Sequence, residues 1–227
     1  NRFSLLEFLW SLRDYLHESG KLLFANGVHQ NRRFHFFALD IMGVEGHGYL
    51  EQKRVMAHQK PFLLLVYNIH DDPAQMQHYY HLCTFYGIYP SFANMRVYKT
   101  PEAYAPVAAL NDRFVPVLRA ITGAGWQPIT HARSSVPDVW LERWGPDDEG
   151  TVYLTVYNSA EEERQPTVTV QVADLGLEGA TLTLEDQLSQ AVESRSRVAG
   201  VPGRSEYAAA KTCSKRTERS ISSVDSN

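Results

Sequence analysis

Cysteine and long hydrophobic runs are both scarce in this chain. Only two of its 227 residues are cysteine, Cys83 and Cys213, too few for a disulfide framework. Cys83 lies among apolar residues spaced as on one helix face, so we expect a buried thiol rather than a nucleophile. No apolar segment approaches the roughly 20 residues of a membrane-spanning helix, and no signal-peptide pattern follows Asn1. We therefore expect a soluble protein with no membrane partner, in a compartment that the sequence does not specify.

Several familiar catalytic motifs are also missing. The sequence has no Gly-x-Ser-x-Gly nucleophile elbow, phosphate-binding loop, dinucleotide fingerprint or His-Glu-x-x-His pair. Serine-hydrolase, nucleotide-binding and zinc-protease functions therefore lose their usual sequence support. His78 and His81 in a helical segment, and the pair His70-Asp71, offer too few converging side chains for a metal site. We expect neither a cofactor nor a metal.

Positive charge is scarce except near the C-terminal end. The net charge is −4, although residues 195–227 carry seven Lys or Arg against three Asp or Glu. The remaining chain is therefore acidic, which disfavours nucleic acid as a partner, because phosphate binding requires a basic face. The segment 195–227 is rich in serine and follows neither a helical nor a strand period. We expect it to be disordered, or foreign to the native protein.

What the sequence does contain is a series of short apolar runs separated by segments of helical periodicity. The runs are 21–26, 38–45, 61–68 and 87–92, and helices are expected over 4–19, 49–59, 72–87 and 102–122, with a short helix or turn at 31–37. Continuous apolar runs are typical of parallel strands that helices cover on both faces. A complete β/α barrel has eight such units in about 250 residues. Residues 1–125 therefore predict about four units, the C-terminal half of a barrel.

Beyond Trp126 the sequence changes from a helical period to alternation of apolar and polar residues. The alternating segments are 139–144, 151–157, 167–172 and 180–184, with turn signals between them. They predict an antiparallel β-sandwich-like domain over 126–194, with a boundary near 126–131. The predicted fold class is thus α/β, a partial β/α barrel followed by this antiparallel domain.

Two carboxylates mark the second apolar run. Glu45 ends it between two glycines, and Asp40 lies five residues earlier. A carboxylate at the end of a barrel strand suits acid/base or nucleophilic work on a glycosidic bond. The two side chains have opposite parity on an extended strand, so both can point into the barrel only if the strand bulges at Gly43. The structural alternatives are a loop cap for Glu45 and an ion pair with an arginine for Asp40.

Other polar and aromatic residues near the strand ends are candidate sugar contacts. Asn26, Asn68 and His70 can hydrogen-bond to hydroxyl groups, while Tyr86 and Tyr89 offer planes on which sugar rings stack. Each has a structural alternative: Asn26 precedes a glycine as in an ordinary turn, and the tyrosines suit core packing equally well.

The strand ends, together with segments 139–144 and 153–158, resemble barrel glycoside hydrolases that carry a C-terminal β-sandwich, such as the α-galactosidase-like and α-amylase-like groups. The resemblance covers roughly residues 20–190 and implies hydrolysis of O-glycosidic bonds by a carboxylate pair. In the α-galactosidase-like group, one catalytic carboxylate comes from the fourth strand and one from the sixth. If the run 38–45 is the sixth strand, Asp40 or Glu45 is the acid/base and the nucleophile lies upstream of Asn1.

Two other functions stay open beside a glycoside hydrolase. One is a catalytically inactive carbohydrate-binding or assembly module, and the other is a barrel hydrolase that uses His70 and Asp71 with a metal. In either case half a barrel has two open sheet edges, so we expect self-association, for example as a dimer that rebuilds a closed sheet.

Overall fold

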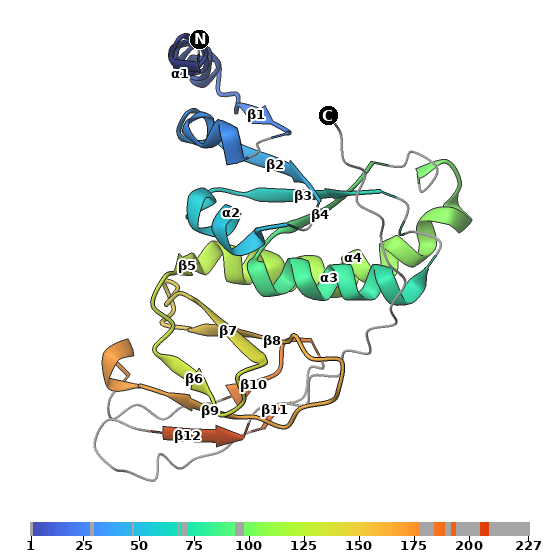
Figure 1. Ribbon diagram of the computed structural model, residues 1–227, viewed down its shortest axis with the longest axis vertical. Coiled ribbons are helices and arrows are strands. Elements are labelled where there is room, and N and C mark those ends of the chain that lie inside the picture. Colours follow the sequence, from blue (N-terminus) through green and yellow to red (C-terminus); the bar gives the residue numbers. More distant parts are fainter. Residues whose placement is uncertain are drawn as a thin grey trace.

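The computed structural model describes residues 2–27, 30–46, 48–67, 69, 72–93, 98–177, 184–188, 192–193 and 205–208. The fold is mixed α/β: a parallel sheet alternating with helices is followed by separate antiparallel sheets (Figure 1). The first part contains α1 (Arg2–Glu18), β1 (Phe24–Ala25), the 3-10 helix η1 (Gln30–Ala38), β2 (Ile41–Glu45), α2 (Leu50–Ala57), β3 (Phe62–Val66), α3 (Pro73–Tyr86), β4 (Tyr89–Phe92) and α4 (Pro101–Ala124). The predicted alternation of strands and helices in this part is confirmed.

Local sequence explains where α3 begins and ends. Asp72 is its N-cap, and Oδ1 of Asp72 accepts hydrogen bonds from the backbone N–H groups of Ala74 (2.9 Å) and Gln75 (3.1 Å). Pro73 occupies the first turn, where its missing N–H costs nothing. Gly87 ends the helix in the left-handed conformation, with φ of 60°.

The parallel sheet has the strand order β1-β2-β3-β4, so each strand pairs with its predecessor in the chain. Among the described residues, one face of it is fully covered, and the buried residues on that face include Met42, Val44, Phe62, Leu64 and Val66. The alternate residues Ile41, Leu63 and Leu65 stay partly exposed. The expectation of helices on both faces is therefore wrong. Right-handed crossovers between strands in sequential order all lie on the same face of the sheet.

The second part of the chain is antiparallel. It contains β5 (Trp126–Gln127), β6 (Ala132–Ser134), β7 (Val139–Trp144), β8 (Tyr153–Asn158), β9 (Thr167–Val170), the 3-10 helix η3 (Ala173–Leu175), β10 (Leu184–Glu185), β11 (Val192–Glu193) and β12 (Ser205–Ala208). The sheets are β5-β7-β8, β12-β9-β6 and the pair β10-β11. Helix α4 ends and strand β5 begins at the start of the interval 126–131, in which we predicted a domain boundary.

The segment 195–227 differs in part from expectation. Residues 205–208 form β12, which pairs antiparallel with β9, whereas disorder was expected over the whole segment. The free edge of β9 presents backbone donors and acceptors, so a short strand can pair there without a hydrophobic pattern of its own. The other residues of 195–227 lie outside the described part of the chain.

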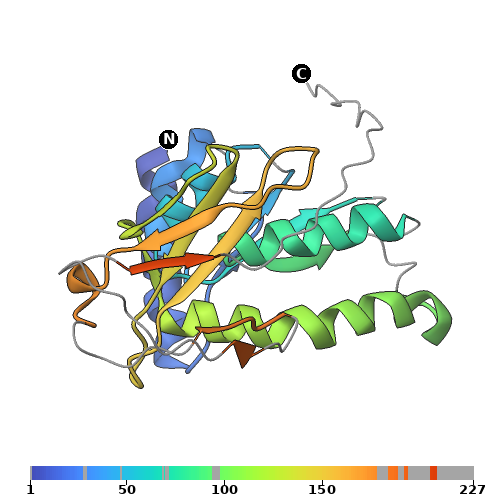
Figure 2. The same cartoon turned by 90° about the horizontal axis from the view of Figure 1, so that it is seen from below.

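The two parts share their packing. Figures 1 and 2 show α3 and α4 side by side, with the parallel sheet on one side and β7 and β8 on the other. The Thr155 hydroxyl donates a hydrogen bond to the Phe85 carbonyl across this junction (2.8 Å). Trp144 of β7 packs with Leu118 and Ile121 of α4 in a second hydrophobic cluster. Within the residues that the structure describes, no helix has both the length and the apolar character to cross a membrane.

Candidate functional site

Glu45, the last residue of β2, is held by a neighbour on each side. Its Oε1 accepts a hydrogen bond from Nδ2 of Asn26 (2.8 Å), and its Oε2 accepts one from the Tyr67 hydroxyl (2.9 Å). Asn26 directly follows β1 and Tyr67 directly follows β3. Three neighbouring parallel strands therefore each supply one side chain at their carboxyl ends. The structure brings together two predicted site residues, Asn26 and Glu45.

A glycine allows close packing beside this carboxylate. Gly43 lies two residues before Glu45, on the same face of β2. A Cβ at Gly43 would lie 2.9 Å from Oδ1 of Asn26 and 3.0 Å from Cζ of Phe24. The absence of a side chain thus lets both residues lie against β2. Phe24 is 49% exposed, so an apolar ring is accessible near Glu45. We call Phe24, Asn26, Glu45 and Tyr67 the carboxyl-edge cluster.

The two hydrogen bonds determine what Glu45 can do. The bond to the Glu45 carboxylate raises the pKa of Tyr67, so the phenol remains a protonated donor at neutral pH. Each carboxylate oxygen accepts one bond and has a second lone pair for a ligand hydroxyl. The pair of donors also holds the side chain in one orientation. The cluster is therefore a fixed acceptor beside an accessible aromatic ring.

Asp40 does not belong to this cluster, because it lies at the opposite end of β2. Its carboxylate accepts a hydrogen bond from the Leu23 backbone N–H (2.7 Å) and contacts Nε2 of His17 (2.9 Å). Partial burial opposes ionisation, but the hydrogen bonds from Leu23 and His17 outweigh it and hold the pKa of Asp40 below its usual range. The side-chain partner of Asp40 is thus a histidine, not an arginine.

The separation of Asp40 and Glu45 excludes joint action on one bond. A strand of five residues spans roughly 16 Å, whereas the paired carboxylates of glycosidases lie about 5–9.5 Å apart. The apolar run 38–45 predicted Asp40 inside the strand, but β2 begins one residue later, at Ile41. Asp40 instead joins the start of the sheet to α1 through His17.

The remaining predicted contacts do not join Glu45. Asn68 and His70 lie outside the described residues. Tyr89 is the first residue of β4, in register with Leu63 of β3 and Gly43 of β2, and its hydroxyl shares a hydrogen bond with Oγ1 of Thr122 (2.9 Å). Tyr86 is buried at the end of α3, and burial raises its pKa to about 12. Both tyrosines therefore pack within the protein, which was the alternative to sugar contact in the sequence analysis.

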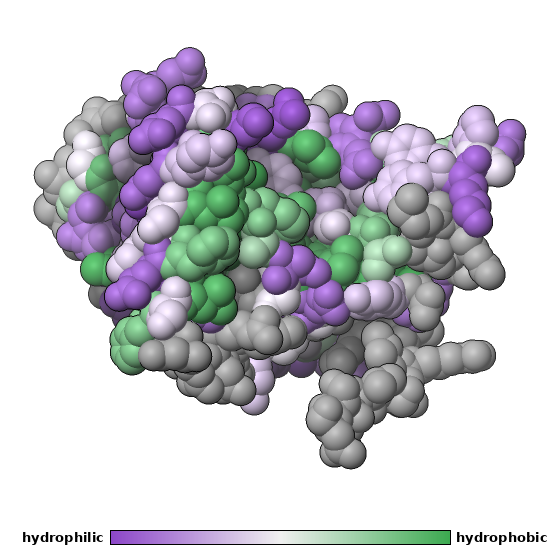
Figure 3. Space-filling model, turned by 90° about the horizontal axis from the view of Figure 1, so that it is seen from above, coloured by the Kyte–Doolittle hydropathy of each residue, from purple (hydrophilic) through white to green (hydrophobic). Residues whose placement is uncertain are grey.

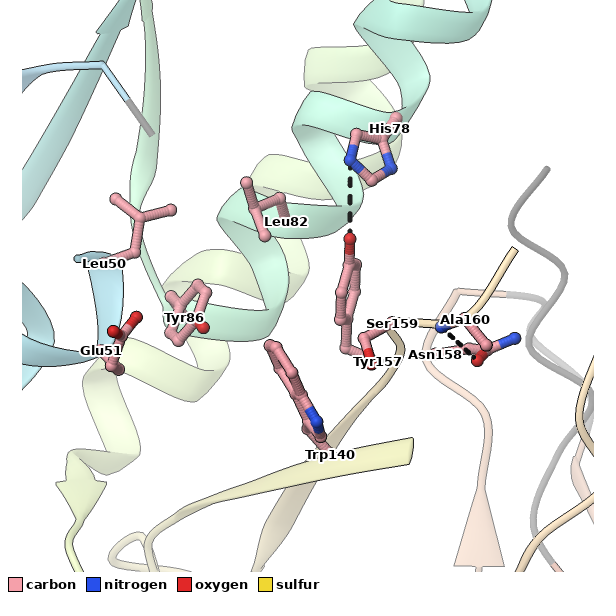
Figure 4. Close-up of a pocket in the computed structure, with 10 residues that line it drawn as sticks. All are labelled: Leu50, Glu51, His78, Leu82, Tyr86, Trp140, Tyr157, Asn158, Ser159 and Ala160. Atoms are coloured by element: carbon pink, nitrogen blue, oxygen red, sulfur yellow. Dashed lines mark hydrogen bonds between the residues drawn. The ribbon is translucent and has the colours of Figure 1, made fainter. Parts of the chain in front are cut away.

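Tyr86 contributes to a separate cavity of about 300 Å³ between the helices and the antiparallel strands (Figure 4). The lining residues are Leu50, Glu51, His78, Leu82, Tyr86, Trp140, Tyr157, Asn158, Ser159 and Ala160. Trp140 and Tyr157 are a cross-strand pair with ring centroids 6.0 Å apart, and the Tyr157 hydroxyl lies 3.5 Å from Nε2 of His78. Asn158 is engaged in its own turn, donating to the Glu162 carbonyl and accepting from the Ala160 N–H. His78 and Asn158 thus bond within the protein, as Glu45 does, but unlike Glu45 neither lies at the carboxyl end of a parallel strand.

Metal ligation has no support among the described residues, since no three His, Cys, Asp or Glu side chains there converge on one point. His81 packs against Phe114, and burial lowers its pKa to about 4, which keeps the ring neutral at physiological pH. Cys83 is fully buried, and its burial raises the pKa of the thiol far above neutral pH. The expectation of a buried thiol at Cys83 is therefore confirmed.

Phe24 and Tyr67 were not among the predicted site residues. Strand parity carried a usable signal for both: Tyr67 lies two residues beyond Leu65, which pairs with Glu45, and Phe24 lies two residues before Asn26. A glycine inside a predicted strand, Gly43, also indicated close approach of another group.

No protein-family model, curated protein or solved structure matches the chain. The resemblance to barrel glycoside hydrolases therefore remains a hypothesis. The geometry of the carboxyl-edge cluster is the basis for the function proposed below.

Proposed function

We propose that the carboxyl-edge cluster is a carbohydrate site and that Glu45 is the acid/base carboxylate of a glycoside hydrolase. The observation that carries the proposal is the placement of Glu45 at the end of a parallel strand, fixed by Asn26 and Tyr67. Phe24 adds an accessible apolar ring on the same face of the sheet. A carboxylate beside an aromatic plane fits a ligand that has hydroxyl groups on its edge and C–H groups on its faces.

In this proposal Glu45 carries the proton. In its protonated form it donates to the glycosidic oxygen as the bond to the sugar breaks, and as a carboxylate it then accepts a proton from the attacking water. Asn26 and Tyr67 keep the side chain in place during both transfers. A second carboxylate must stabilise the sugar cation or attack it. Asp72 also follows β3, but it does not supply this second carboxylate, because its side chain caps α3.

The arrangement of β1–β4 also supports a finer description of the fold. Sequential parallel strands with their crossovers on one face are the arrangement of consecutive units in a β/α barrel. We infer that β1–β4 are such a half-barrel and that the antiparallel sheets of residues 126–194 are a β-sandwich-like domain. The uncovered face with Ile41, Leu63 and Leu65 then corresponds to the interior of the barrel. Active sites of barrels lie at the carboxyl ends of the strands, where Glu45 lies.

A carbohydrate-binding module without turnover is the second candidate. The observation that favours it is the distance between Asp40 and Glu45, because it leaves Glu45 without the partner carboxylate that the sequence offered. Binding needs only the ring of Phe24 and the polar groups of the cluster, whereas hydrolysis needs a second carboxylate as well.

Replacing Glu45 by Gln distinguishes these functions. Glu45→Gln keeps the shape of the side chain but removes the transferable proton. Turnover of a glycoside with a poor leaving group is expected to fall by on the order of 10²–10⁴, while an activated aryl glycoside, which needs little protonation, loses less. Initial rates on both substrates and ligand-detected NMR of sugar binding are the measurements.

Asp40→Asn is the matched control and is expected to leave turnover unchanged, because Asp40 lies at the other end of β2. Full activity of Glu45→Gln would refute the acid/base role. Sugar binding that Phe24→Ala weakens, without any turnover by the wild type, would select the binding module. If the wild type shows no sugar binding and no turnover, the carbohydrate site is refuted.

A further inference from the structure

A second cavity, of about 250 Å³, lies where the end of α2, the last turns of α4 and strand β5 come together (Figure 1). Among the described residues that line it, none is Asp or Glu, whereas four are basic: Arg54, His58, Lys60 and Arg119. The whole chain has a net charge of −4, so this group of basic side chains does not reflect the overall composition. We call this cavity the basic pocket.

On helix α1, by comparison, charges of both signs lie side by side. Figure 3 looks onto the end of the molecule formed by α1, where apolar side chains gather beside a strip of hydrophilic ones. Arg13 pairs with Asp14 on this helix (2.9 Å). In the basic pocket, no carboxylate of the described residues lies within ion-pair distance of Arg54, Lys60 or Arg119. Cations that no carboxylate neutralises attract an anionic ligand.

Arg54 is the most buried of the basic side chains, with 2% of its surface exposed. Its guanidinium donates hydrogen bonds to the carbonyls of Gly87 (3.2 Å), Lys60 (3.3 Å) and His58, while its Nε has no partner among the described residues. Burial lowers the pKa of Arg54 to about 10, and the charge of Glu142 opposes this shift only in part. A buried cation without a carboxylate in contact costs free energy. An anion bound nearby would recover part of this cost.

The backbone at His58, beside this arginine, has an unfavourable conformation. Its φ is 50° and its ψ is −113°, in a region that glycine adopts far more readily than other residues. Arg54 helps to hold this conformation, because it donates to the His58 carbonyl. The imidazole ring lies edge-on to Trp126, with ring centroids 6.3 Å apart, and lines the pocket. Strained residues of this kind cluster at ligand sites.

The basic side chains of the pocket are of two kinds. Nζ of Lys60 is fixed by hydrogen bonds to three carbonyls, those of Phe36 (2.7 Å), Phe37 (3.2 Å) and Leu39 (2.6 Å). Arg119 is exposed on α4, and neither its guanidinium nor the ring of His58 has a hydrogen bond within the described part of the chain. Arg54 and Lys60 therefore supply fixed positive charge, while Arg119 and His58 have N–H groups available to a ligand.

We propose that the basic pocket binds a phosphate group, either as free phosphate or on a small phosphate monoester. Arginine matches phosphate oxygens in both geometry and charge. A phosphate dianion also offsets more of the positive charge of Arg54, Lys60 and Arg119 than a single carboxylate does. The volume of about 250 Å³ lies just below the about 300–1,000 Å³ of sites for larger organic ligands, so we expect a small ligand.

The basic pocket and the carboxyl-edge cluster lie at opposite ends of the parallel sheet. Residues 58–61 connect α2 to β3, so His58 and Lys60 precede the amino end of β3. Glu45 is the last residue of β2, and it pairs with Leu65 near the carboxyl end of β3. The phosphate site therefore does not depend on the proposed role of Glu45, and either proposal can fail without the other.

A ³¹P NMR titration of the whole chain at constant ionic strength tests the site, first with inorganic phosphate and then with glycerol phosphate. We expect a dissociation constant on the order of 0.1–1 mM for the better ligand, and the comparison tells free phosphate from a monoester. Arg119→Gln removes a charged donor and should weaken binding about 10–100-fold. Arg113→Gln is the matched control, because Arg113 is exposed on the same helix but does not line the pocket, and it should bind like the wild type.

His58→Gly tests the strained residue. Glycine adopts a φ of 50° without steric cost, so the variant should be about as stable as the wild type in urea unfolding, whereas its affinity for phosphate should fall about tenfold. Absence of binding by the wild type up to about 10 mM phosphate, or an affinity that neither Arg119→Gln nor His58→Gly lowers, would overturn the proposal. Acetate that binds as tightly as phosphate at the same ionic strength would also overturn it.

Discussion

At the scale of the residue, Asp40 and Glu45 show how two carboxylates on one short strand take different roles. Glu45 accepts hydrogen bonds from two side chains at an accessible edge. Asp40 accepts from a backbone N–H and contacts a histidine, so its role is to join β2 to the preceding segments. The different surroundings, not the shared chemistry of the two side chains, decide which of them is available to a ligand.

The lowered pKa of Asp40 leads to a pH-dependent prediction. A carboxyl whose folded-state pKa lies below its unfolded value stabilises the fold above the unfolded value, 3.8, and this contribution is lost as the pH falls through the folded value. Asp40→Asn is therefore expected to lower the free energy of unfolding by about 1 kcal/mol at pH 7. The difference from the wild type should shrink below pH 4.

Urea unfolding of both proteins at several pH values between 7 and 3 measures this difference. Asp14→Asn is the control, because Asp14 is exposed on α1 and pairs with the neighbouring Arg13. If Asp40→Asn lowers the free energy of unfolding by the same amount at every pH down to 3, the hydrogen bonds, and not the charge, account for the loss of stability.

At the scale of the element, helix boundaries follow from residues within a few positions of them. Asp72-Pro73 opens α3 and Thr100-Pro101 opens α4, where the Thr100 hydroxyl oxygen accepts a hydrogen bond from the Ala103 N–H (3.2 Å). In both cases a polar side chain satisfies N–H groups that lack helical partners, and the proline occupies a position that needs no donor.

Removal of the Asp72 cap should destabilise the fold by about 0.5–2 kcal/mol, because two backbone N–H groups lose their acceptor. Asp72→Ala is the test variant. Asp72→Ser keeps a side-chain oxygen at the same position and is expected to retain most of the stability. Guanidinium unfolding followed by circular dichroism compares the two, and equal stability of both variants would mean that the cap contributes nothing.

At the scale of the whole molecule, Gly87 joins the helices to the antiparallel sheet. It has φ of 60°, and a Cβ there would lie 2.1 Å from Cη2 of Trp144 on β7. The ring of Trp144 therefore packs directly against the end of α3. Trp144 also lies with Leu118 and Ile121 of α4. The two parts of the chain are thus packed together through this tryptophan.

Gly87→Ala is expected to lower the free energy of unfolding by about 2–5 kcal/mol, from the left-handed backbone and from displacement of Trp144. Gly20→Ala is the matched control. Gly20 has φ of 66°, but a Cβ added there would meet no atom within 4 Å, so only the backbone cost of about 1–2 kcal/mol applies. Calorimetric melting of both variants measures the difference, and similar losses would argue against tight packing at Trp144.

Local features follow directly from the amino-acid sequence: the alternation of strands and helices, the caps of α3 and α4, and the change of period after Trp126. The sequence also placed Asn26 and Glu45 at strand ends, since a residue that follows an apolar run lies near the carboxyl edge of a parallel sheet. These features depend on residues close together in the chain.

Tertiary structure alone decided the rest. The pairing of Glu45 with Tyr67 depends on the register of β2 against β3, and the place of Asp40 depends on where β2 starts. The coverage of a single sheet face follows from the handedness of the crossovers, and the pairing of β12 with β9 joins segments far apart in the chain. Each of these features is a contact between elements that are distant in sequence. Apolar periodicity describes one element at a time, so it does not predict such contacts.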